Sequence, residues 1–588
     1  MHQISAFRRL FPRNREDRLW IVAVVLCSAL FAFACVLPHV LQVRDAQYPY
    51  QGIAIMPTDQ EFYYAARVRE VADGFWSVGN AYRETKDTPG LQPAFPEWTI
   101  AMAGRIFGFD PVTAFLLSRI VLGFLVSFLF IGLFTALTRR KWEVLLAVAF
   151  LLFAGSILGS PWNIMSMLFD VHAHDWLRFA RPVNPQWSSA WFLLAVWLLH
   201  AWLTHRKAWQ MPLIAMCTAV MLYSYVYAWT FMGVVLVCVF VQCALNKDTK
   251  RLLDFVWFGF IFFLLALPYA FHMHELVNNS LYAETAVRQG LVERRLPVFG
   301  VWATVLVLLI PFRKWLMPAG FGLVPAFAVA GIVTLNQQLI TGQYLVPHHY
   351  HWYFVQPLAS LFLVTGFFSL VSLYLPKKWS VALGSLLMLF FVAFGFVQQQ
   401  RGYNDSAKYW GQLQQYAPVM QAIRQQGIGP RQVIFISNQS PILPDLTAVY
   451  TAADVYFAGN ANGFLTSDAR ARNSYFMDLW LQGVTPEQAE KEFPTTRRFM
   501  LSSRVHSIYY RELLDDYSAI PDVEVAASIQ AYKDFFALTT DEKIALHPMQ
   551  FALFTPLDTK TDAWTDLLNH SNVLFQENGY VLAKIVTR

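Results

Sequence analysis

The sequence predicts a polytopic α-helical membrane protein of about 11 transmembrane helices, followed by a C-terminal extracytoplasmic α/β domain. Of its 588 residues, 56% are hydrophobic and only 14% are charged, which is about half the charged fraction of an ordinary soluble domain. An aromatic share of 16% excludes a disordered polymer, because such chains lack apolar bulk. The first 400 residues carry a net charge of +10 and the rest −4, which gives the total of +6. A basic, apolar part therefore precedes a more ordinary, mildly acidic one.

Eleven apolar runs are candidate transmembrane helices, since a spanning helix needs about 20 apolar residues. The runs are 19–41, 114–137, 142–158, 187–203, 209–227, 231–245, 254–271, 298–311, 320–335, 354–375 and 380–397. The first run is too long for the apolar part of a signal peptide, and no small-residue cleavage site follows it. We therefore expect it to be retained as a helix.

Basic residues beside the runs predict the orientation, because Lys and Arg in short loops stay on the cytoplasmic side. In an alternating topology, 17 Lys and Arg residues of the N-terminal segment and the short connectors fall on one side. The N-terminus is thus expected to be cytoplasmic, in an inner (plasma) membrane. Residues 1–398 would form a transmembrane domain and 399–588 a periplasmic or extracellular domain.

Four segments on the predicted outer face are long and rich in acidic, His, Arg and aromatic residues. They are 42–113, 161–186, 272–297 and 336–353. The inner connectors are short and basic by comparison. Any chemistry is therefore expected on the outer face.

Asp59 and Glu61 are the candidate catalytic carboxylates of the first outer segment. The preceding turn predicts a short helix that Thr58 or Asp59 caps. If both carboxylates were helical they would lie about 200° apart, so only one need face a site. A carboxylate near an apolar boundary has the raised basicity that suits deprotonation of an acceptor hydroxyl. A plain helix cap is the alternative for Asp59.

The second outer segment gathers candidate metal and phosphate ligands. The candidate metal ligands are Asp170, His172, His174 and Asp175. Mixed carboxylate and imidazole ligands suit Mn²⁺ or Zn²⁺ better than Mg²⁺ or Ca²⁺, so a divalent cation (Mn, Mg or Zn) is the candidate cofactor. Arg178 and Arg181 share one face of a helix and can clamp a phosphate. A solvated loop with locally bonded histidines is the alternative.

Further arginines and a histidine cluster complete the candidate substrate site. Arg288 lies near the outer boundary together with Arg294 and Arg295, against the inside-positive pattern, which predicts a partner such as a lipid phosphate. Arg119 is a further phosphate ligand, with snorkelling to the interface as the alternative. The cluster consists of His348, His349, Tyr350 and His351. It combines hydrogen-bonding edges with flat apolar faces, as a sugar or phosphosugar requires, whereas an aromatic interfacial belt leaves its histidines unexplained.

The combined pattern resembles the GT-C superfamily of glycosyltransferases, polytopic enzymes that use polyprenyl-phosphate-linked sugars. The resemblance covers the architecture of the whole chain. Residues 95–98 (FPEW), 107–111 (FGFDP) and 118–120 (SRI) are similar to the start of the second span in the protein-mannosyltransferase and aminoarabinose-transferase branch. The resemblance implies an inverting glycosyltransferase. Its expected partners are a polyprenyl-phosphate-linked sugar donor, an extracytoplasmic acceptor (lipid, polysaccharide or protein) and the lipid bilayer, with no nucleic acid.

Asp59 is the position that matches the first-loop carboxylate of this family, which is its catalytic base or a metal ligand. The chain departs from the family in two places. Gln60 separates Asp59 from Glu61, whereas the mannosyltransferase branch has adjacent Asp and Glu. Residues 170–172 match the Asp-x-Asp motif of the oligosaccharyltransferase branch only in part, and its Trp-Trp-Asp-Tyr-Gly motif is absent. An asparagine-glycosylating enzyme is therefore not expected.

Residues 399–588 show an α/β pattern without a catalytic motif. We expect strands at 432–437, 505–510 and 580–586 and a short helix at 486–493. Acceptor binding and a purely structural cap are both open as roles for this domain.

Three other functions remain open for the whole chain: a transporter or flippase of lipid-linked sugars, an O-antigen polymerase or ligase, and a non-catalytic assembly protein. One outer cavity that joins residues 59, 170–181, 288 and 348–351 would favour an enzyme. A continuous path through the membrane would favour a carrier.

Overall fold

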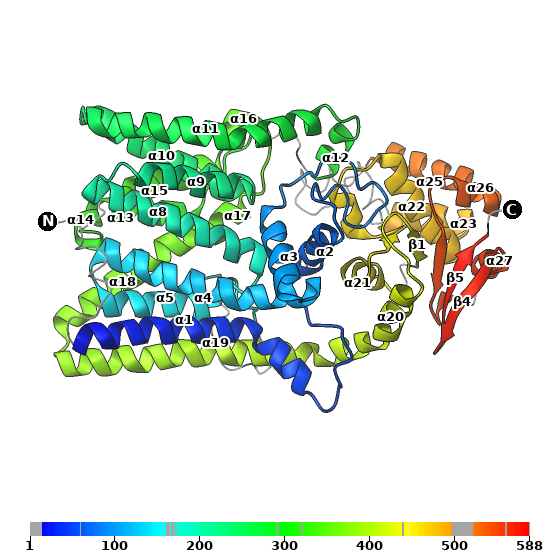
Figure 1. The fold of residues 1–588 in the computed structure, drawn as a ribbon, viewed down its shortest axis with the longest axis horizontal. Coiled ribbons are helices and arrows are strands. Elements are labelled where there is room, and N and C mark those ends of the chain that lie inside the picture. The colour runs from blue at the N-terminus through cyan, green and yellow to red at the C-terminus, as the bar shows by residue number, and fades with distance from the viewer. Residues whose placement is uncertain are drawn as a thin grey trace.

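The structure, a computed structural model, describes residues 15–586 apart from short gaps. The residues left out within this range are 59, 160–164, 166–169, 171, 173, 290, 292, 294, 319–321, 438–439, 497–520 and 559–560. Asp59 and the predicted strand 505–510 thus lie outside the described residues. Figure 1 shows a bundle of long helices at one end of the molecule and a smaller domain at the other.

Each predicted apolar run coincides with a helix of the bundle. The helices are α1 (Arg15–Arg44), α4 (Pro111–Thr138), α5 (Lys141–Ala154), α8 (Ser188–His205), α9 (Gln210–Leu222), α10 (Val226–Leu245), α11 (Thr249–Val277), α13 (Val301–Leu309), α15 (Leu323–Leu335), α18 (Gln356–Tyr374) and α19 (Lys377–Leu413). In the described residues, seven helices are long and apolar enough to cross a membrane. The helical membrane class is confirmed, and the count of eleven spans stays a prediction.

Helix α19 runs for 37 residues and passes the predicted domain boundary at residue 398 without a break. Residues 398–413 are mostly polar but contain no proline, so nothing in them removes a helical hydrogen bond. The membrane bundle and the C-terminal domain are therefore joined by one continuous helix.

Short helices cover the end of the bundle that faces the C-terminal domain. They are α2 (Glu61–Ala72), α3 (Phe95–Phe107), α12 (Tyr282–Arg288), α16 (Gln338–Thr341), α17 (His348–Tyr350) and the π-helical turns η3 (Pro182–Trp187) and η5 (His351–Val355). In Figure 1, α2, α3 and α12 lie between the bundle and the C-terminal domain. The predicted outer segments thus meet at one end of the molecule.

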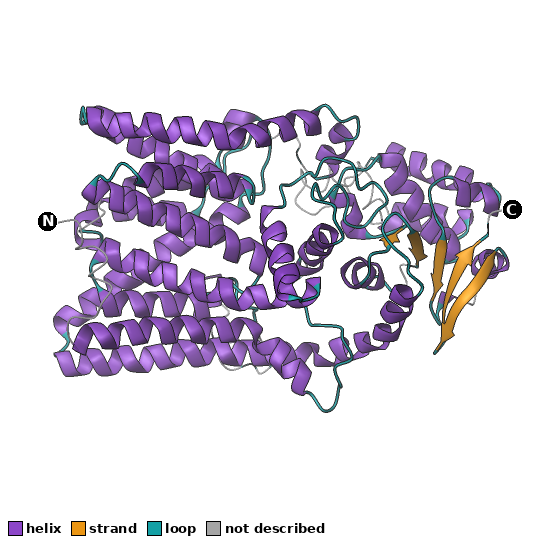
Figure 2. Cartoon of the chain, viewed as in Figure 1, coloured by secondary structure: helices purple, strands orange, loops and turns teal. Residues whose placement is uncertain are grey.

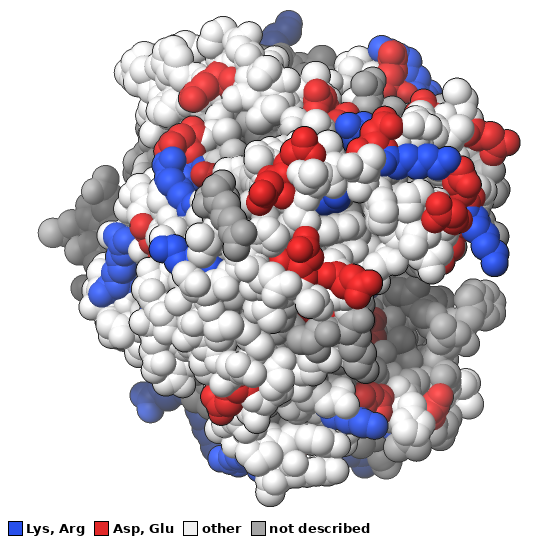
Figure 3. Space-filling model, turned by 90° about the vertical axis from the view of Figure 1, so that its right-hand side faces the viewer, with Lys and Arg blue, Asp and Glu red and all other residues white. Residues whose placement is uncertain are grey.

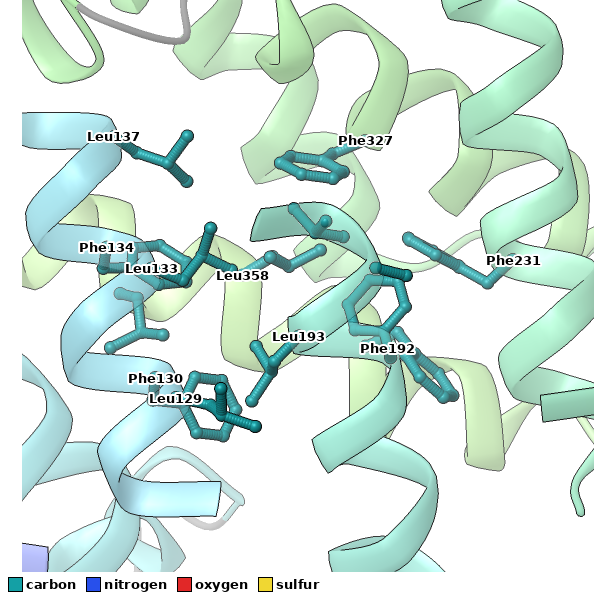
Figure 4. Packing of buried hydrophobic residues seen from close by; sticks show 14 of the residues in the cluster. Leu129, Phe130, Leu133, Phe134, Leu137, Phe192, Leu193, Phe231, Phe327 and Leu358 are labelled. Atoms are coloured by element: carbon teal, nitrogen blue, oxygen red, sulfur yellow. The ribbon is translucent and has the colours of Figure 1, made fainter. Parts of the chain in front are cut away.

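The centre of the bundle is filled by close-packed apolar side chains (Figure 4). Phe134 of α4, Leu193 of α8, Phe231 of α10 and Leu358 of α18 are each at most 2% exposed. Aromatic rings from different helices are in contact here, as between Phe192 and Phe231, whose centroids are 5.7 Å apart. This packing fixes the helices that position the outer segments.

The C-terminal domain is built on a five-stranded sheet in the order β2-β1-β3-β5-β4 (Figure 2). The strands are β1 (Val433–Ile436), β2 (Asp454–Val455), β3 (Phe551–Phe554), β4 (Ser571–Glu577) and β5 (Tyr580–Ile585). β1 is parallel to β2 and β3, whereas β5 is antiparallel to β3 and β4. The expected strands at 432–437 and 580–586 are confirmed; β3 and β4 were not predicted.

Helices surround this sheet and complete an α/β domain. They are α20 (Ala417–Gln425), α21 (Leu443–Tyr450), the 3-10 turn η7 (Gly459–Gly463), α22 (Asp468–Leu481), α23 (Pro486–Thr496), α25 (Asp522–Phe536), α26 (Thr540–Ala545) and α27 (Asp562–Asn569). The predicted helix at 486–493 is confirmed as α23.

A buried ion cluster fastens the C-terminal domain to the first outer segment. Lys86 Nζ lies 2.7 Å from Glu70 Oε2 and 2.6 Å from Asp454 Oδ1, and none of the three side chains is more than 4% exposed. The Val455 N–H donates to the Tyr82 carbonyl oxygen at 2.7 Å beside them. The domain is thus docked on the bundle by desolvated contacts.

The two ends of the molecule differ in surface chemistry. Figure 3 faces the C-terminal domain, where acidic and basic side chains lie interspersed. In contrast, α11 exposes Val256, Trp257 and Phe263, each at more than 60%. A helix face of this kind is expected to face lipid.

Candidate functional site

A cavity of about 1190 Å³ lies where the outer segments meet the C-terminal domain. Its walls come from three of the four outer segments, from α10, α11 and α15, and from η7 of the C-terminal domain. Gln60, Arg288, His349 and Asn462 all line it. The fold therefore brings together residues that are up to about 400 positions apart in the chain.

One part of the cavity wall is apolar and belongs to the membrane helices. Val226 and Val234 of α10, Met273 of α11 and Val333 of α15 contribute to it. The two valines of α10 are eight residues apart, so this wall extends for about 12 Å along the helix axis. An extended hydrocarbon chain matches such a surface.

The remaining wall is aromatic and rich in amides. Its aromatic residues are Tyr63, Tyr64, Tyr225, Tyr227, Trp229, Tyr269, Tyr282, Tyr350, Phe457 and Tyr475. Its amides are Gln60, Gln92, Gln289, Gln337, Gln343, Asn460 and Asn462. Flat apolar faces beside neutral hydrogen-bonding groups suit a saccharide, whose rings are apolar on their faces and polar at their edges.

Gln60, the residue after Asp59, connects the cavity to the second outer segment. Its Oε1 accepts a hydrogen bond from Arg181 Nη1 at 3.2 Å. Arg181 Nη2 also donates to the Tyr353 hydroxyl at 3.3 Å, and its guanidinium lies 5.4 Å from the centre of the Tyr64 ring. A cation is therefore held, 9% exposed, beside the start of α2.

Glu61 does not line the cavity but forms a buried ion pair with Arg119. Arg119 Nη2 donates to Glu61 Oε2 at 2.9 Å, and both side chains are 1% exposed. Asp110 caps α4, accepting from the N–H groups of Val112 and Thr113, which fixes the start of the helix that carries Arg119. The snorkelling alternative for Arg119 is wrong, because its guanidinium is buried against a carboxylate from α2.

The four predicted metal ligands of the second outer segment do not converge. His172 Nδ1 and His174 Nδ1 lie 3.3 and 3.0 Å from the two carboxylate oxygens of Asp405 on α19. Asp170 Oδ1 accepts from the backbone N–H of His172, and Asp175 donates its own N–H to Gln398. In the part of the chain that the structure describes, no group of three or more His, Cys, Asp or Glu side chains is arranged to hold a metal ion.

The predicted phosphate-binding arginines have separate surroundings. Arg178 donates to Gln356, the first residue of α18, and does not line the cavity. Arg288 lines the cavity but also forms an ion pair with Asp468 of the C-terminal domain. Burial lowers the pKa of the Arg288 guanidinium, and the charge of Asp468 opposes that shift. The predicted clamp by Arg178 and Arg181 stays a prediction, since the two arginines bond to different partners, Gln356 and Gln60.

The histidine cluster contributes two residues to the cavity. His349 bonds to the Tyr225 hydroxyl, and its ring centre lies 4.6 Å from that of Tyr227. The Tyr350 hydroxyl is 2.8 Å from the Thr230 hydroxyl of α10. His348 and His351 lie outside the lining. These bonds hold the fourth outer segment against the outer end of α10.

No protein-family model and no curated protein matches the chain. Among solved structures, it is similar to ArnT from Cupriavidus metallidurans bound to undecaprenyl phosphate, with 13% identity, a TM-score of 0.41 and coverage of 96% of this chain and 98% of that one. It is also similar to the Archaeoglobus fulgidus oligosaccharyltransferase in the apo form, with 12% identity, a TM-score of 0.41 and coverage of 91% of this chain and 69% of that one. A third similar structure is the archaeal oligosaccharyltransferase AglB from Archaeoglobus fulgidus in complex with an inhibitory peptide and a dolichol-phosphate. It has 10% identity, a TM-score of 0.40 and coverage of 97% of this chain and 75% of that one.

Several cavity residues were not predicted as site residues. Tyr225, Tyr227 and Trp229 fall within residues 209–229, most of which we assigned to a membrane span. The signal was present, since 223–229 holds three Tyr and one Trp in seven residues, and amphipathic aromatics collect at the membrane interface. Asn460 and Asn462 carried no signal, because they lie in a turn that only the tertiary fold brings to the cavity.

Proposed function

We propose that the chain is an integral-membrane glycosyltransferase that moves a sugar from a polyprenyl-phosphate-linked donor to an extracytoplasmic acceptor, a lipid, polysaccharide or protein. The observation that carries this proposal is one cavity that has an apolar wall on the membrane helices α10, α11 and α15 and seven amides from the outer segments and η7. A lipid-linked sugar is a molecule with the same two halves. The N-terminus would be cytoplasmic and the C-terminal domain periplasmic or extracellular.

The reaction would take place where Gln60 meets the cavity. The acceptor oxygen attacks the anomeric carbon of the donor sugar, the bond from that carbon to the phosphate oxygen breaks, and polyprenyl phosphate leaves with the electron pair. Asp59, directly before Gln60 in the chain, would take the proton of the acceptor hydroxyl as general base. Attack from the side opposite the leaving phosphate inverts the anomeric carbon.

The departing phosphate needs positive charge, and two arginines are close to the cavity. Arg181 touches Gln60, and Arg288 lines the wall directly. Donors fixed in place before the reaction stabilise a developing charge without reorganisation. The Glu61–Arg119 pair would act indirectly, by holding the first residue of α2 and thereby the position of Asp59.

A carrier of lipid-linked sugars is the second function to weigh. Its substrate must pass through the bundle, whereas the centre of this bundle between α4, α8, α10 and α18 is filled by buried side chains (Figure 4). The seven amides of the cavity all come from the outer segments and from η7 of the C-terminal domain. Both features favour chemistry at one face over transport across the membrane.

Turnover of the donor tests the proposed function. Full-length protein in lipid nanodiscs would be incubated with polyprenyl-phosphate-linked sugars, one sugar at a time, and the polyprenyl phosphate released would be measured. We expect release from at least one donor, and a loss of about 10²- to 10⁴-fold in Asp59→Asn, the usual contribution of a general base. Full release by Asp59→Asn would refute the assignment of Asp59.

A further inference from the structure

The polar wall of the cavity is almost uncharged. Arg288 is the one Lys, Arg, Asp or Glu among the described residues that line it, and Asp468 is ion-paired with that arginine. Seven amide side chains, eight Tyr hydroxyls and four Ser or Thr hydroxyls supply most of the remaining polar groups. Arg288 can pair with the phosphate of a donor, because a buried charge is costly unless it is paired. The part of the wall formed by η7 supplies only amides and glycines, so this part suits a neutral ligand.

Two asparagines of η7 are held so that one offers an acceptor and the other a donor. Asn460 Nδ2 donates to Asp445 Oδ1 at 2.9 Å, and the side chain also bonds to Tyr82, so Oδ1 is the atom that we assign to a ligand. Asn462 Oδ1 accepts from Arg83 Nη2 at 3.1 Å, which leaves its Nδ2 for a ligand. Asp445 and Arg83 determine which end of each amide points toward its partner, since a carboxylate only accepts and a guanidinium only donates hydrogen bonds.

The anchor of Asn462 is itself rigid. Arg83 is 1% exposed and also donates to the Thr466 hydroxyl at 2.6 Å. The neighbouring backbone is fixed as well, because Gln289 Nε2 donates to the Asn462 carbonyl oxygen at 3.1 Å. A preorganised pair of this kind loses little conformational entropy when a ligand binds.

An aromatic face lies beside this pair. A β-carbon placed on Gly463 would lie 3.7 Å from Cε2 of Tyr63, so the turn borders the edge of that ring. The Tyr63 ring is itself supported by Phe464, with the centroids 5.2 Å apart. Tyr63 and Gly463 both line the cavity.

We propose that η7 of the C-terminal domain forms the acceptor subsite and that it binds an uncharged saccharide. Each hydroxyl of a sugar both donates and accepts, so neighbouring hydroxyls match the Asn460 Oδ1 and Asn462 Nδ2 groups, while the ring packs on Tyr63. A phosphate or carboxylate offers only acceptors and would meet Asn460 Oδ1 unfavourably. This inference rests on the proposed function and assigns the substrate class of its acceptor.

Saccharide binding by the full chain tests the subsite. Detergent-solubilised protein would be applied to an array of neutral oligosaccharides and of the same oligosaccharides carrying phosphate or carboxylate groups. We expect binding to neutral members, weakened about tenfold in Asn462→Asp, which keeps the contact with Arg83 but replaces the donor. The matched control is Asn572→Asp, an exposed asparagine of β4, which should bind as the wild type does.

A second variant tests the subsite independently, in case Asn462→Asp does not fold. Gly463→Leu leaves both asparagines in place and fills the space in front of Tyr63, where a β-carbon makes only ordinary contacts. It too should weaken binding of neutral members. Three results would overturn the subsite. The protein could bind only the anionic oligosaccharides, it could bind none of them, or both variants could bind the neutral ones as well as the wild type does.

Donor turnover without an acceptor separates the two proposals. The wild type and the control Asn572→Asp should release polyprenyl phosphate slowly to water, because Asn572 of β4 lies outside the cavity lining. Release of polyprenyl phosphate by a protein that binds no neutral saccharide would refute the subsite alone. Absence of any donor turnover would refute the proposed function instead.

Discussion

Arg119 of α4 and Glu61 of α2 form an ion pair of 2.9 Å in which both side chains are 1% exposed. The pair joins the second predicted span to the first residue of the helix that follows Asp59. Gln60, between the two acidic residues, lines the cavity. The pair thus determines where the start of α2 lies relative to the cavity.

Removal of one partner from this pair should be costly, because the other charge stays buried. We expect Glu61→Gln to lower the free energy of unfolding by about 3–5 kcal/mol. Replacement of both residues by leucine should cost less than Glu61→Gln, since no buried charge is left. Thermal unfolding in detergent measures both changes.

The exposed pair of Glu293 and Arg295 provides the control for this measurement. Their side chains are 76% and 55% exposed, so Glu293→Gln should change stability by less than about 0.5 kcal/mol. A Glu61→Gln protein that unfolds at the wild-type temperature would show that the buried pair does not hold α2.

The cluster of Lys86, Glu70 and Asp454 should make domain docking depend on pH. One lysine faces two carboxylates, and burial raises the pKa of Glu70 from 4.5 to about 7. As pH rises from about 4.5, the unfolded chain releases this proton first, so the free energy of unfolding falls by about 3 kcal/mol up to pH 7. Above pH 7 this contribution stays constant.

Glu70→Gln should remove that part of the pH dependence. The difference in Tm between pH 5 and pH 8 would then be smaller than in the wild type, with the main gain in stability at pH 8. Equal differences in Tm for the two proteins would show that Glu70 keeps an ordinary pKa in the folded state.

Arg181 should be more sensitive to substitution than its charge alone suggests. It donates to Gln60 and Tyr353 and lies over the Tyr64 ring. Arg181→Lys keeps the charge but cannot keep all three contacts. We expect both Arg181→Lys and Arg181→Ala to lower kcat for polyprenyl phosphate release about 10²- to 10³-fold.

Arg69 is the matched control for Arg181, because it lies on α2 but pairs with Asp73 away from the cavity. Arg69→Ala should keep kcat within about twofold, as a partly exposed pair contributes little. Wild-type turnover by Arg181→Lys would show that the geometry of the guanidinium does not matter for the reaction.

The sequence predicted the helices well because apolar length is a local property. All eleven apolar runs became helices, but the long α19 was predicted only in part, since its outer half is polar and resembles soluble chain. β3 and β4 were missed because the run at 551–554 is only four residues long and 571–577 lacks an alternating apolar pattern.

The site was predicted less completely because it is built from distant segments. Glu61 and Arg119 are 58 positions apart, and no local pattern indicates that one neutralises the other. His172 and His174 fitted a metal site in sequence, yet both contact Asp405, which lies more than 230 positions away. Residue types identified the outer face as the region of interest, and only the fold selects which of them reach the cavity.

The most direct test of the account is a cryo-electron microscopy structure of the protein in nanodiscs with a polyprenyl phosphate. The account predicts density for the isoprenoid along Val226 and Val234 of α10, with the phosphate beside Gln60 and Arg181. Density for the lipid only on the outside of the bundle, with the phosphate away from Gln60, would contradict the proposal that this cavity binds the donor.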